Sequence, residues 1–329
     1  MQVHEGIRLL QKVLYARILG EYAPIDQSGA RIAASSEGVS RMKPTILIAG
    51  ATGATGRVAT KLLLQQGFPV RALVHRDDER SSKLRAEGAE IVVGDLLDFR
   101  AVRRAFDGAQ RAYFVYPIRP GITQATAQFA QAALEAKAEF IVNMSQKSSR
   151  RDSKSDAALQ HWLSERVFDW AGTPVAHLRP TYFADWLLYM RNMIRAGRMS
   201  VPFGTTGRHA PIAAEDQGAV IAAILADPAP HKGQIYPLFG PVELTAPEIA
   251  ATVGKILGKE IRYEKITAQQ WAREVTGQEI PFLAQHLQEV AIDHNDGIFA
   301  GTNDLVEKIA GRPPMTVSEF VEKNRAAFQ

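Results

Sequence analysis

The sequence predicts an α/β protein whose main domain has a Rossmann fold: a doubly wound parallel sheet, followed by a smaller C-terminal α/β substrate-side domain. The first observation is a regular alternation of short apolar runs and helical segments from Lys43 to about residue 180. Such alternation is typical of a parallel sheet with crossover helices. The second observation is a glycine-rich turn, Gly50–Gly56, between the first strand and the first helix.

The expected elements follow one another in order. Thr45–Ala49 is a short continuous apolar run, as in a strand that is buried on both faces. Five further strands are expected at Pro69–His75, Glu90–Val93, Arg111–Tyr116, Phe140–Ser145 and Pro174–Leu178. The helices between the strands are expected at Arg57–Gln66, Ser82–Glu87, Phe99–Phe106, Gly121–Ala138 and Ser155–Ala171. The first three of these helices end beside a glycine, which is a common stop signal.

Three segments are predicted along the chain. Residues 1–42 form an N-terminal extension, with a helix at Ile7–Leu19 and a linker rich in Ser, Ala and Gly at Gln27–Ser40. Residues 43–180 form the Rossmann domain. Residues 181–329 form the substrate-side domain, in which strands are expected near Gln234–Leu238 and Glu260–Lys265 and part of which returns to the sheet.

The role of the N-terminal extension stays open. Its amphipathic helix could dock a partner, lie on a membrane surface or serve as a targeting peptide. Glu5 and Glu21 count against a transit peptide. Met42, followed by Lys and Pro just before the first strand, has the position of a natural start. We therefore expect residues 1–41 to contribute little to the function.

The composition excludes several classes of protein. The chain has no cysteine, which excludes disulfides, cysteine–zinc sites, iron–sulfur clusters and thiol nucleophiles and fits the cytoplasm, where we expect the protein. The net charge of +4 is spread along the chain, so no nucleic-acid partner is expected. No apolar run approaches the ~20 residues of a membrane-spanning helix, so no membrane partner is expected. The oligomeric state stays open, with a homodimer as one alternative.

The glycine-rich turn has the spacing GxxGxxG. Gly50 permits the tight turn, Gly53 lets the backbone approach a pyrophosphate, and Gly56 lets the helix pack close to the strand. The N-terminus of the helix offers free N–H groups and a partial positive charge to phosphate oxygens. Because a strand precedes the turn and a helix follows it, we predict a bound nicotinamide dinucleotide. The residues predicted to contact it here are Gly50, Thr52, Gly53, Ala54, Thr55 and Gly56.

The residue at the end of the second strand distinguishes the two nicotinamide cofactors. An acidic residue there binds the 2′-hydroxyl of NAD, whereas an arginine accommodates the 2′-phosphate of NADP. Arg76 occupies this position, and Asp77 and Asp78 follow it. We therefore favour NADP(H) over NAD(H), although Arg76 could also be a solvated loop residue. Asp95 and Leu96, after the third strand, are placed to border the adenine, and Asp95 could instead cap its own loop.

Several motifs together resemble one known family. They are GATGATGR at Gly50–Arg57, VHR at Val74–Arg76, GDLLD at Gly94–Asp98, NMSQ at Asn143–Gln146 and LRPTYFADW at Leu178–Trp186. With later segments such as DQGAVIAAILADP, they are similar to the NmrA-like branch of the atypical short-chain dehydrogenases. The resemblance covers most of the chain.

The resemblance implies two classes of function. The family includes NADPH-dependent reductases of quinones, azo dyes and triphenylmethane dyes. It also includes redox-sensing proteins that bind the dinucleotide without turning over a substrate. We expect an NADPH-dependent oxidoreductase that transfers hydride to a small, flat, quinone-like or otherwise conjugated acceptor, with a cofactor-binding sensor or regulator as the alternative.

The chain departs from the ordinary short-chain dehydrogenases on the helix after the fifth strand. Those enzymes carry Tyr-x-x-x-Lys there, and this chain carries His161 and Glu165 at the same spacing. A spacing of i,i+4 puts both side chains on one face of the helix. His161 could donate a proton, and a nearby carboxylate would favour its protonated form. Glu165 could instead accept a hydrogen bond from a ribose hydroxyl, or the pair could lie exposed without a function.

Further candidates follow the other strands. Ser145 could hydrogen-bond a substrate oxygen or the nicotinamide, or simply form a turn. Tyr116 and Pro117 are expected to line the nicotinamide side, and Tyr182 is expected to contact the cofactor. Tyr182 with Trp186 also offers aromatic surface for a flat acceptor, although aromatic residues are more often core. His209 and His231 have no partner at metal-ligand spacing, so no metal site is predicted.

Overall fold

The computed structural model describes residues 43–329, which form one compact unit by their internal contacts. The expected helix at Ile7–Leu19 and the linker at Gln27–Ser40 lie outside the described residues. Within residues 43–329, no helix is both long and apolar enough to cross a membrane.

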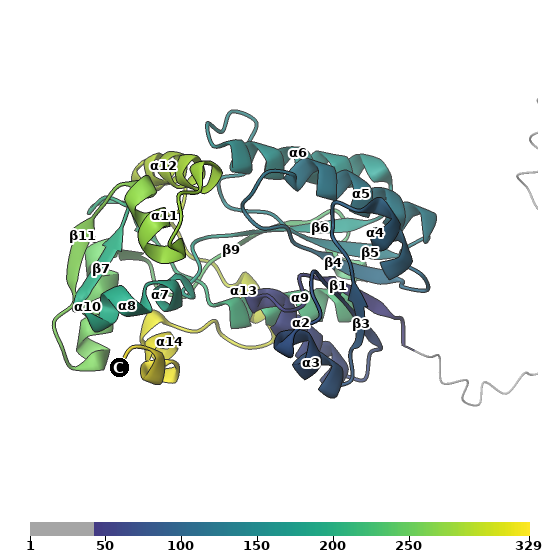
Figure 1. Ribbon diagram of the computed structural model, residues 1–329, viewed down its shortest axis with the longest axis horizontal. Coiled ribbons are helices and arrows are strands. Elements are labelled where there is room, and N and C mark those ends of the chain that lie inside the picture. Colours follow the sequence, from purple (N-terminus) through teal and green to yellow (C-terminus); the bar gives the residue numbers. More distant parts are fainter. Residues whose placement is uncertain (1–42) are drawn as a thin grey trace, which may run out of the picture. The chain divides into compact units, whose positions relative to one another are not determined.

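A parallel sheet of seven strands forms the centre of the structure and confirms the predicted fold class (Figure 1). Its strand order is β3-β2-β1-β4-β5-β6-β9, and every neighbouring pair is parallel. The order reverses between β1 and β4, and the carboxyl ends of the strands at such a reversal form a ligand-binding crevice. The strands are β1 (Ile46–Ala49), β2 (Val70–Val74), β3 (Glu90–Val93), β4 (Arg111–Phe114), β5 (Phe140–Met144), β6 (Val175–Pro180) and β9 (Ile235–Leu238).

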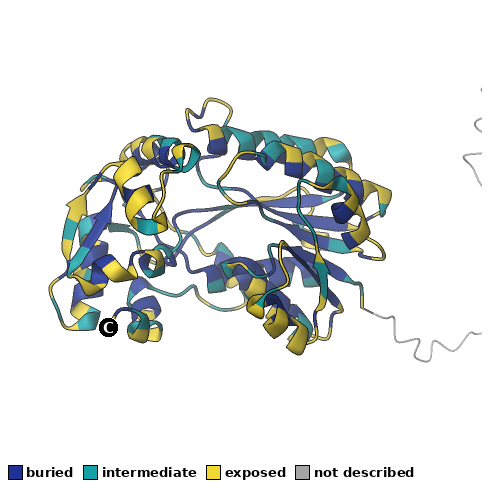
Figure 2. Ribbon diagram, in the orientation of Figure 1, coloured by how far each residue is buried: buried dark blue, intermediate teal, exposed yellow. Residues whose placement is uncertain are grey.

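Helices cover both faces of this sheet. One face carries α4 (Phe99–Ala105), α5 (Ile122–Glu135) and α6 (Asp156–Ala171). The other face carries α2 (Ala54–Gln65), α3 (Glu79–Ala86), α9 (Ala214–Ala226) and α13 (Leu305–Ala310). Every residue of β1 is buried, which explains its uninterrupted apolar sequence (Figure 2).

The remaining elements form a second lobe at the carboxyl ends of the strands. In it β7 pairs with β11 in parallel, and β8 pairs with β10 antiparallel. Its strands are β7 (Arg198–Val201), β8 (Arg208–His209), β10 (Leu244–Thr245) and β11 (Arg262–Lys265). Its helices are α7 (Trp186–Tyr189), α8 (Arg191–Arg195), α10 (Ala246–Leu257), α11 (Ala268–Thr276), α12 (Pro281–Asn295) and α14 (Val317–Lys323), with short 3₁₀ turns at Ala229–His231 and Arg325–Ala327.

The segment after residue 180 contributes to both parts of the structure. The lobe has its own apolar core, to which Tyr182 belongs, whereas β9 extends the sheet beside β6 and α9 packs on α2. The strands expected near Gln234–Leu238 and Glu260–Lys265 are present as β9 and β11. The division of the chain into domains at residue 181 stays a prediction.

Two helices begin earlier than the sequence predicted. α2 starts at Ala54 with Gly53 as its N-cap, so Gly56 lies inside the helix and not in the turn before it. α3 starts at Glu79, because the Asp78 carboxylate accepts hydrogen bonds from the N–H groups of Arg80 and Ser81. This capping signal places Arg80 in the first turn of α3.

Gly53 and Gly56 of the turn are glycines for different structural reasons. A Cβ atom on Gly56 would lie 2.4 Å from the Gly50 carbonyl oxygen and 2.9 Å from its carbon, so only glycine permits this close packing of helix on turn. A Cβ atom on Gly53 would lie 3.1 Å from the same oxygen, which a small shift relieves. Gly56 is therefore a packing residue, whereas Gly53 borders the open end of the helix.

We expect Gly56→Ala to lower the free energy of unfolding by about 1–3 kcal/mol, because a backbone overlap cannot be relieved by rotating a side chain. Gly53→Ala is the matched control and should cost clearly less in the protein without cofactor. Thermal and urea denaturation of both variants measures the difference. Equal losses of stability in the two variants would contradict the packing role of Gly56.

Candidate functional site

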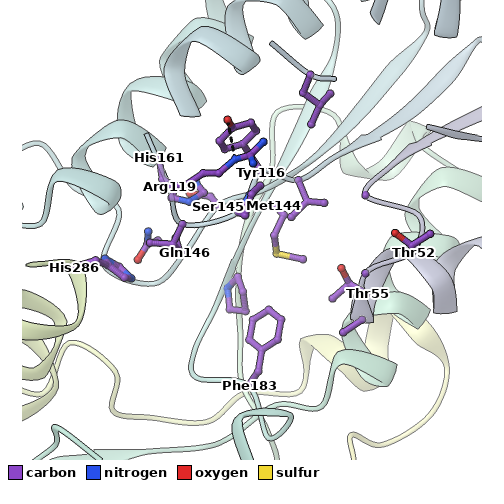
Figure 3. Close-up of a pocket in the computed structure, with 18 of the residues that line it drawn as sticks. Thr52, Thr55, Tyr116, Arg119, Met144, Ser145, Gln146, His161, Phe183 and His286 are labelled. Atoms are coloured by element: carbon purple, nitrogen blue, oxygen red, sulfur yellow. Dashed lines mark hydrogen bonds between the residues drawn. The ribbon is translucent and has the colours of Figure 1, made fainter. Parts of the chain in front are cut away.

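A pocket of ≈ 660 Å³ lies at the carboxyl ends of the central strands (Figure 3). One end is formed by the glycine-rich turn and by residues that follow β2 and β3. The other end is formed by residues that follow β4, β5 and β6, by α6 and by α12 of the second lobe. In Figure 3, Thr52 and Thr55 lie on one side of the pocket, and His161, Gln146 and His286 lie on the other.

The pocket brings together most of the residues predicted to bind the cofactor. Its lining includes Gly50, Thr52, Gly53, Ala54, Thr55, Asp95, Leu96, Tyr116, Pro117, Ser145 and Tyr182. Two predicted residues are not in the lining. Gly56 is buried behind the turn, and Arg76 is exposed outside the pocket. Arg80, which the sequence analysis did not select, lines the pocket near the end of β2.

The start of α2 is suited to a phosphate group. Its N-cap is Gly53, which has no side chain that could accept a hydrogen bond from the first turn. That turn contains no acidic residue. The N–H groups that normally await a capping side chain are therefore free to bind an anion. The Thr55 hydroxyl is 2.9 Å from the buried Tyr113 hydroxyl, so this threonine is committed to a partner inside the protein.

Charged groups cluster where β2 and β3 end. The Arg80 guanidinium contacts the Asp78 carboxylate at 2.6 Å. Asp95 Oδ1 accepts a hydrogen bond from the N–H of Leu97, and Asp95 Oδ2 lies 3.6 Å from His75 Nδ1. Asp95 therefore caps its own loop and also faces the pocket, so both of its expected roles remain open.

Ser145 and Glu165 form a buried hydrogen-bonded group with Arg179. The Ser145 hydroxyl donates to Glu165 Oε1 at 2.6 Å, and Arg179 donates to both carboxylate oxygens at 2.8 and 2.5 Å. Glu165 is fully buried and is not in the pocket lining, whereas Ser145 is. The carboxylate thus lies behind Ser145 and fixes the direction of its hydroxyl.

His161 lines the pocket in a state that the sequence analysis did not expect. We expected a nearby carboxylate to favour the protonated imidazole; burial instead lowers the pKa of His161 to about 4, with His286 adding to the effect. Glu165 acts in the opposite direction and does not compensate, because its charge is paired with that of Arg179. His161 and Glu165 are both buried, so they are not an exposed helix pair.

Besides Arg80, the polar lining residues that were not found from the sequence include Arg119, Gln146 and His286. Gln146 follows β5, and its buried Nε2 has no hydrogen-bond partner within residues 43–329. His286 comes from α12, where its Nδ1 is 2.7 Å from the Ser155 hydroxyl. Gln146 belongs to the NMSQ segment and could have been selected for its position. No local pattern marks His286, because its partner is 131 positions away in the chain.

Several contacts hold α12 over the loop that joins β5 to α6. Asp293 accepts two hydrogen bonds from the Arg150 guanidinium, at 2.6 and 2.7 Å. Gln285 accepts from the backbone N–H of Asp156 and donates to the carbonyl of Lys154. The second lobe is thereby fixed to the Rossmann part at the edge of the pocket.

Aromatic rings form the wall of the pocket in the second lobe. The Tyr182 ring stacks on Phe299 with 4.4 Å between centroids, and its hydroxyl donates to the carbonyl of Val290. Trp186, Phe183 and Tyr182 all line the pocket. Behind them His209 Nδ1 is 3.0 Å from His294 Nε2, but residues 43–329 contain no group of three or more side chains that could hold a metal ion.

Comparison with known proteins identifies what this chain is similar to. A model of the NmrA-like family matches residues 42–321. The chain is 32% identical to an NAD(P)H azoreductase of Xenophilus azovorans over 86% of its own length and 99% of that protein. Its fold is similar to that of an NADPH-dependent quinone oxidoreductase from Escherichia coli, solved with NADPH (TM-score 0.74, 23% identity, 85% and 99% of the two chains). It is also similar to the fold of a triphenylmethane reductase from Citrobacter sp. (TM-score 0.71, 20% identity, 85% and 99%).

The buried histidines make the stability of the protein depend on pH. Burial lowers the pKa of His161 and His286 to about 4 and that of His209 to about 3, with His294 adding to the last shift. Below pH 6.5 the unfolded chain binds protons that the folded chain does not, so stability falls as the pH drops from 6.5 toward 4. We expect a loss of up to about 2 kcal/mol per histidine between pH 6.5 and 5.

Urea denaturation at pH 7.5, 6.5, 5.5 and 5.0 measures this loss. His161→Gln should make the loss smaller, because it removes one of the buried neutral imidazoles. A pH dependence that is the same in His161→Gln as in the natural chain would show that His161 is not buried in its neutral form.

Proposed function

The chain belongs to the NmrA-like family, and from this we propose that it is an NADPH-dependent oxidoreductase that transfers hydride to a quinone-like or other conjugated small acceptor. The observation that carries the proposal is one continuous pocket that joins an uncapped helix N-terminus to an aromatic wall. A pocket that only recognised the dinucleotide would not need the aromatic rings that the second lobe contributes beyond the nicotinamide side. The 32% identity to an NAD(P)H azoreductase over nearly its whole length supports the same class of reaction.

The residues of the pocket fit a nicotinamide dinucleotide. The free N–H groups at the start of α2 would hold the pyrophosphate, and Gly53 would let the backbone approach it. Tyr116, Pro117 and Ser145 would line the nicotinamide side. The reduced nicotinamide supplies the hydride, and a quinone that receives this hydride and one proton becomes a hydroquinone.

Around Ser145, the acceptor end would bind and orient the substrate with neutral groups. The Ser145 hydroxyl gives its hydrogen to Glu165, so in its 2.8 Å contact with the Ser149 hydroxyl it is the acceptor. The second lone pair of the Ser145 oxygen would then accept a hydrogen bond from a ligand. When the Ser155 hydroxyl donates to His286 Nδ1, the ring proton lies on Nε2, which with Gln146 Nε2 offers N–H groups to an oxygen or nitrogen of the acceptor. Aromatic rings from the second lobe would cover the flat substrate and exclude water.

No strong acid is needed in this reaction. A conjugated acceptor delocalises the negative charge that arrives with the hydride, so water can supply the proton. His161 is neutral near pH 7 because of its burial, and a neutral imidazole suits a weak, hydrogen-bonding role. We therefore assign His161 to orienting the acceptor, with at most a modest part in proton transfer.

We also propose that NADP(H) is preferred over NAD(H). Two arginines support this preference at the end of β2, namely Arg76 on the surface and Arg80 in the pocket lining. An arginine in this region suits a 2′-phosphate, whereas NAD-binding sites have an acidic residue. The expectations of a cytoplasmic location and of a homodimer remain predictions.

Cofactor preference gives the first test. Arg76→Ala and Arg80→Ala should each weaken NADPH binding about tenfold, because each removes a charged hydrogen bond to the 2′-phosphate. NADH binding should change less than about twofold, since that phosphate is absent. Calorimetric titrations of both cofactors measure this, with Arg85→Ala, whose partner is Asp77, as the control outside the pocket. Equal losses for NADPH and NADH in both variants would remove the basis for the preference.

Turnover gives the second test and separates the enzyme from a cofactor sensor. The natural chain should oxidise NADPH in the presence of small quinones and azo dyes, followed as loss of absorbance at the nicotinamide band. His161→Ala should lower kcat by about tenfold or less, below the 10²–10⁴-fold typical of a general acid. Tight NADPH binding without oxidation by any quinone or dye would instead favour the sensor.

A further inference from the structure

A tight turn after β4 holds one arginine over the pocket. The Tyr116 hydroxyl donates to the carbonyl of Pro120 at 3.2 Å and accepts a hydrogen bond from Arg119 Nε at 3.1 Å. The Arg119 guanidinium also lies 5.0 Å from the centre of the Tyr116 ring. Gly121, with φ of +105°, leaves room for this arrangement, because a Cβ atom there would lie 2.9 Å from the Tyr116 hydroxyl. Arg119 is thus held in place by its Nε, and its two terminal amino groups make no hydrogen bond within residues 43–329.

Among the described residues, Arg119 has no counterion, unlike the other charged residues of the pocket lining. Arg80 is paired with Asp78, and Asp95 faces His75. Within residues 43–329, no carboxylate lies within 4 Å of the Arg119 guanidinium. Glu165, the acidic group nearest to Ser145, is fully buried and neutralised by Arg179. Within the part of the chain that the structure describes, the acceptor end of the pocket therefore carries a single fixed positive charge.

We propose that Arg119 binds an anionic substituent, a carboxylate or sulfonate, on the conjugated acceptor. This inference rests on the proposed reductase function and specifies its substrate class. A guanidinium that is fixed through Nε presents its two terminal N–H groups as a planar fork, which matches two oxygens of such an anion. The pocket thereby favours anionic acceptors, accepts neutral ones and disfavours cationic dyes.

A phosphate of the cofactor is the other anion that could reach an arginine in this pocket. The pyrophosphate has its own site at the uncapped start of α2, which lies on the opposite side of the pocket from Arg119 in Figure 3. The 2′-phosphate is expected near the end of β2, beside Arg80. Arg119, which follows β4, is left for the substrate.

The test compares acceptors that differ in charge. Arg119→Gln is measured with 1,2-naphthoquinone-4-sulfonate, with neutral 1,2-naphthoquinone and with a cationic triphenylmethane dye such as malachite green. We expect kcat/KM to fall about three- to tenfold for the sulfonate, to stay within about twofold for the neutral quinone, and to rise for the cation. Arg119→Lys should restore part of the loss. Arg104→Gln, which removes an equal charge from the surface of α4, should show none of these differences.

The remaining outcomes are also decisive. NADPH affinity should be unchanged in Arg119→Gln; a loss equal to that for the sulfonate would assign Arg119 to a cofactor phosphate and overturn the proposal. A change in kcat/KM that is the same for all three charges would also overturn it. If no acceptor is turned over, the proposed function fails, and equilibrium binding of the same three compounds to the NADPH-loaded chain replaces kcat/KM. Binding that weakens only for the sulfonate then still supports the anion site, and binding unaffected by charge contradicts it.

Discussion

The close approach of helix α2 to the turn after β1 is the constraint on which the pocket depends. Gly56 permits α2 to lie against the Gly50 carbonyl, and the helix begins after Gly53, an N-cap that has no side chain. The free N–H groups and the helix dipole then face the crevice where the strand order reverses. A helix that started further from the sheet, or one capped by its own side chain, would leave this end of the pocket without its attraction for an anion.

At the other end of the pocket, the buried Glu165–Arg179 ion pair orients the lining without contributing a charge to it. Glu165 is buried with Arg179, so its role is to orient Ser145 and not to contact a ligand directly. The histidines that reach the lining are neutral because they are buried. The result is a surface of aromatic rings and neutral donors with one exposed arginine. Such a surface suits a delocalised acceptor better than an alcohol or ketone that needs a strong acid.

The sequence was sufficient for the fold, and for most of the residues that line the pocket beside the glycine-rich turn, because that information is local. Strand, turn and helix follow one another at Ile46–Gln65, and each step has its own pattern of apolar residues and glycines. The acceptor half depends on contacts between distant segments. His286 meets Ser155 only after the second lobe has folded back, and no spacing in the sequence records this. The protonation of His161 was misjudged for a related reason, since burial is a property of the packed structure.

The path of the chain between α2 and α9 has a consequence for how this protein is made. The apolar face of α2 is covered by α9, whose Gly218 fits against Val58 and the carbonyl of Thr55. α9 and β9 come late in the chain. During translation the ribosome therefore releases the first βα units well before the elements that cover them have been made. Segments in this state are prone to aggregate. The yield of folded protein in a cell is therefore expected to depend on how fast the ribosome translates the segment between α2 and α9. It should also depend on the chaperones that bind the incomplete sheet.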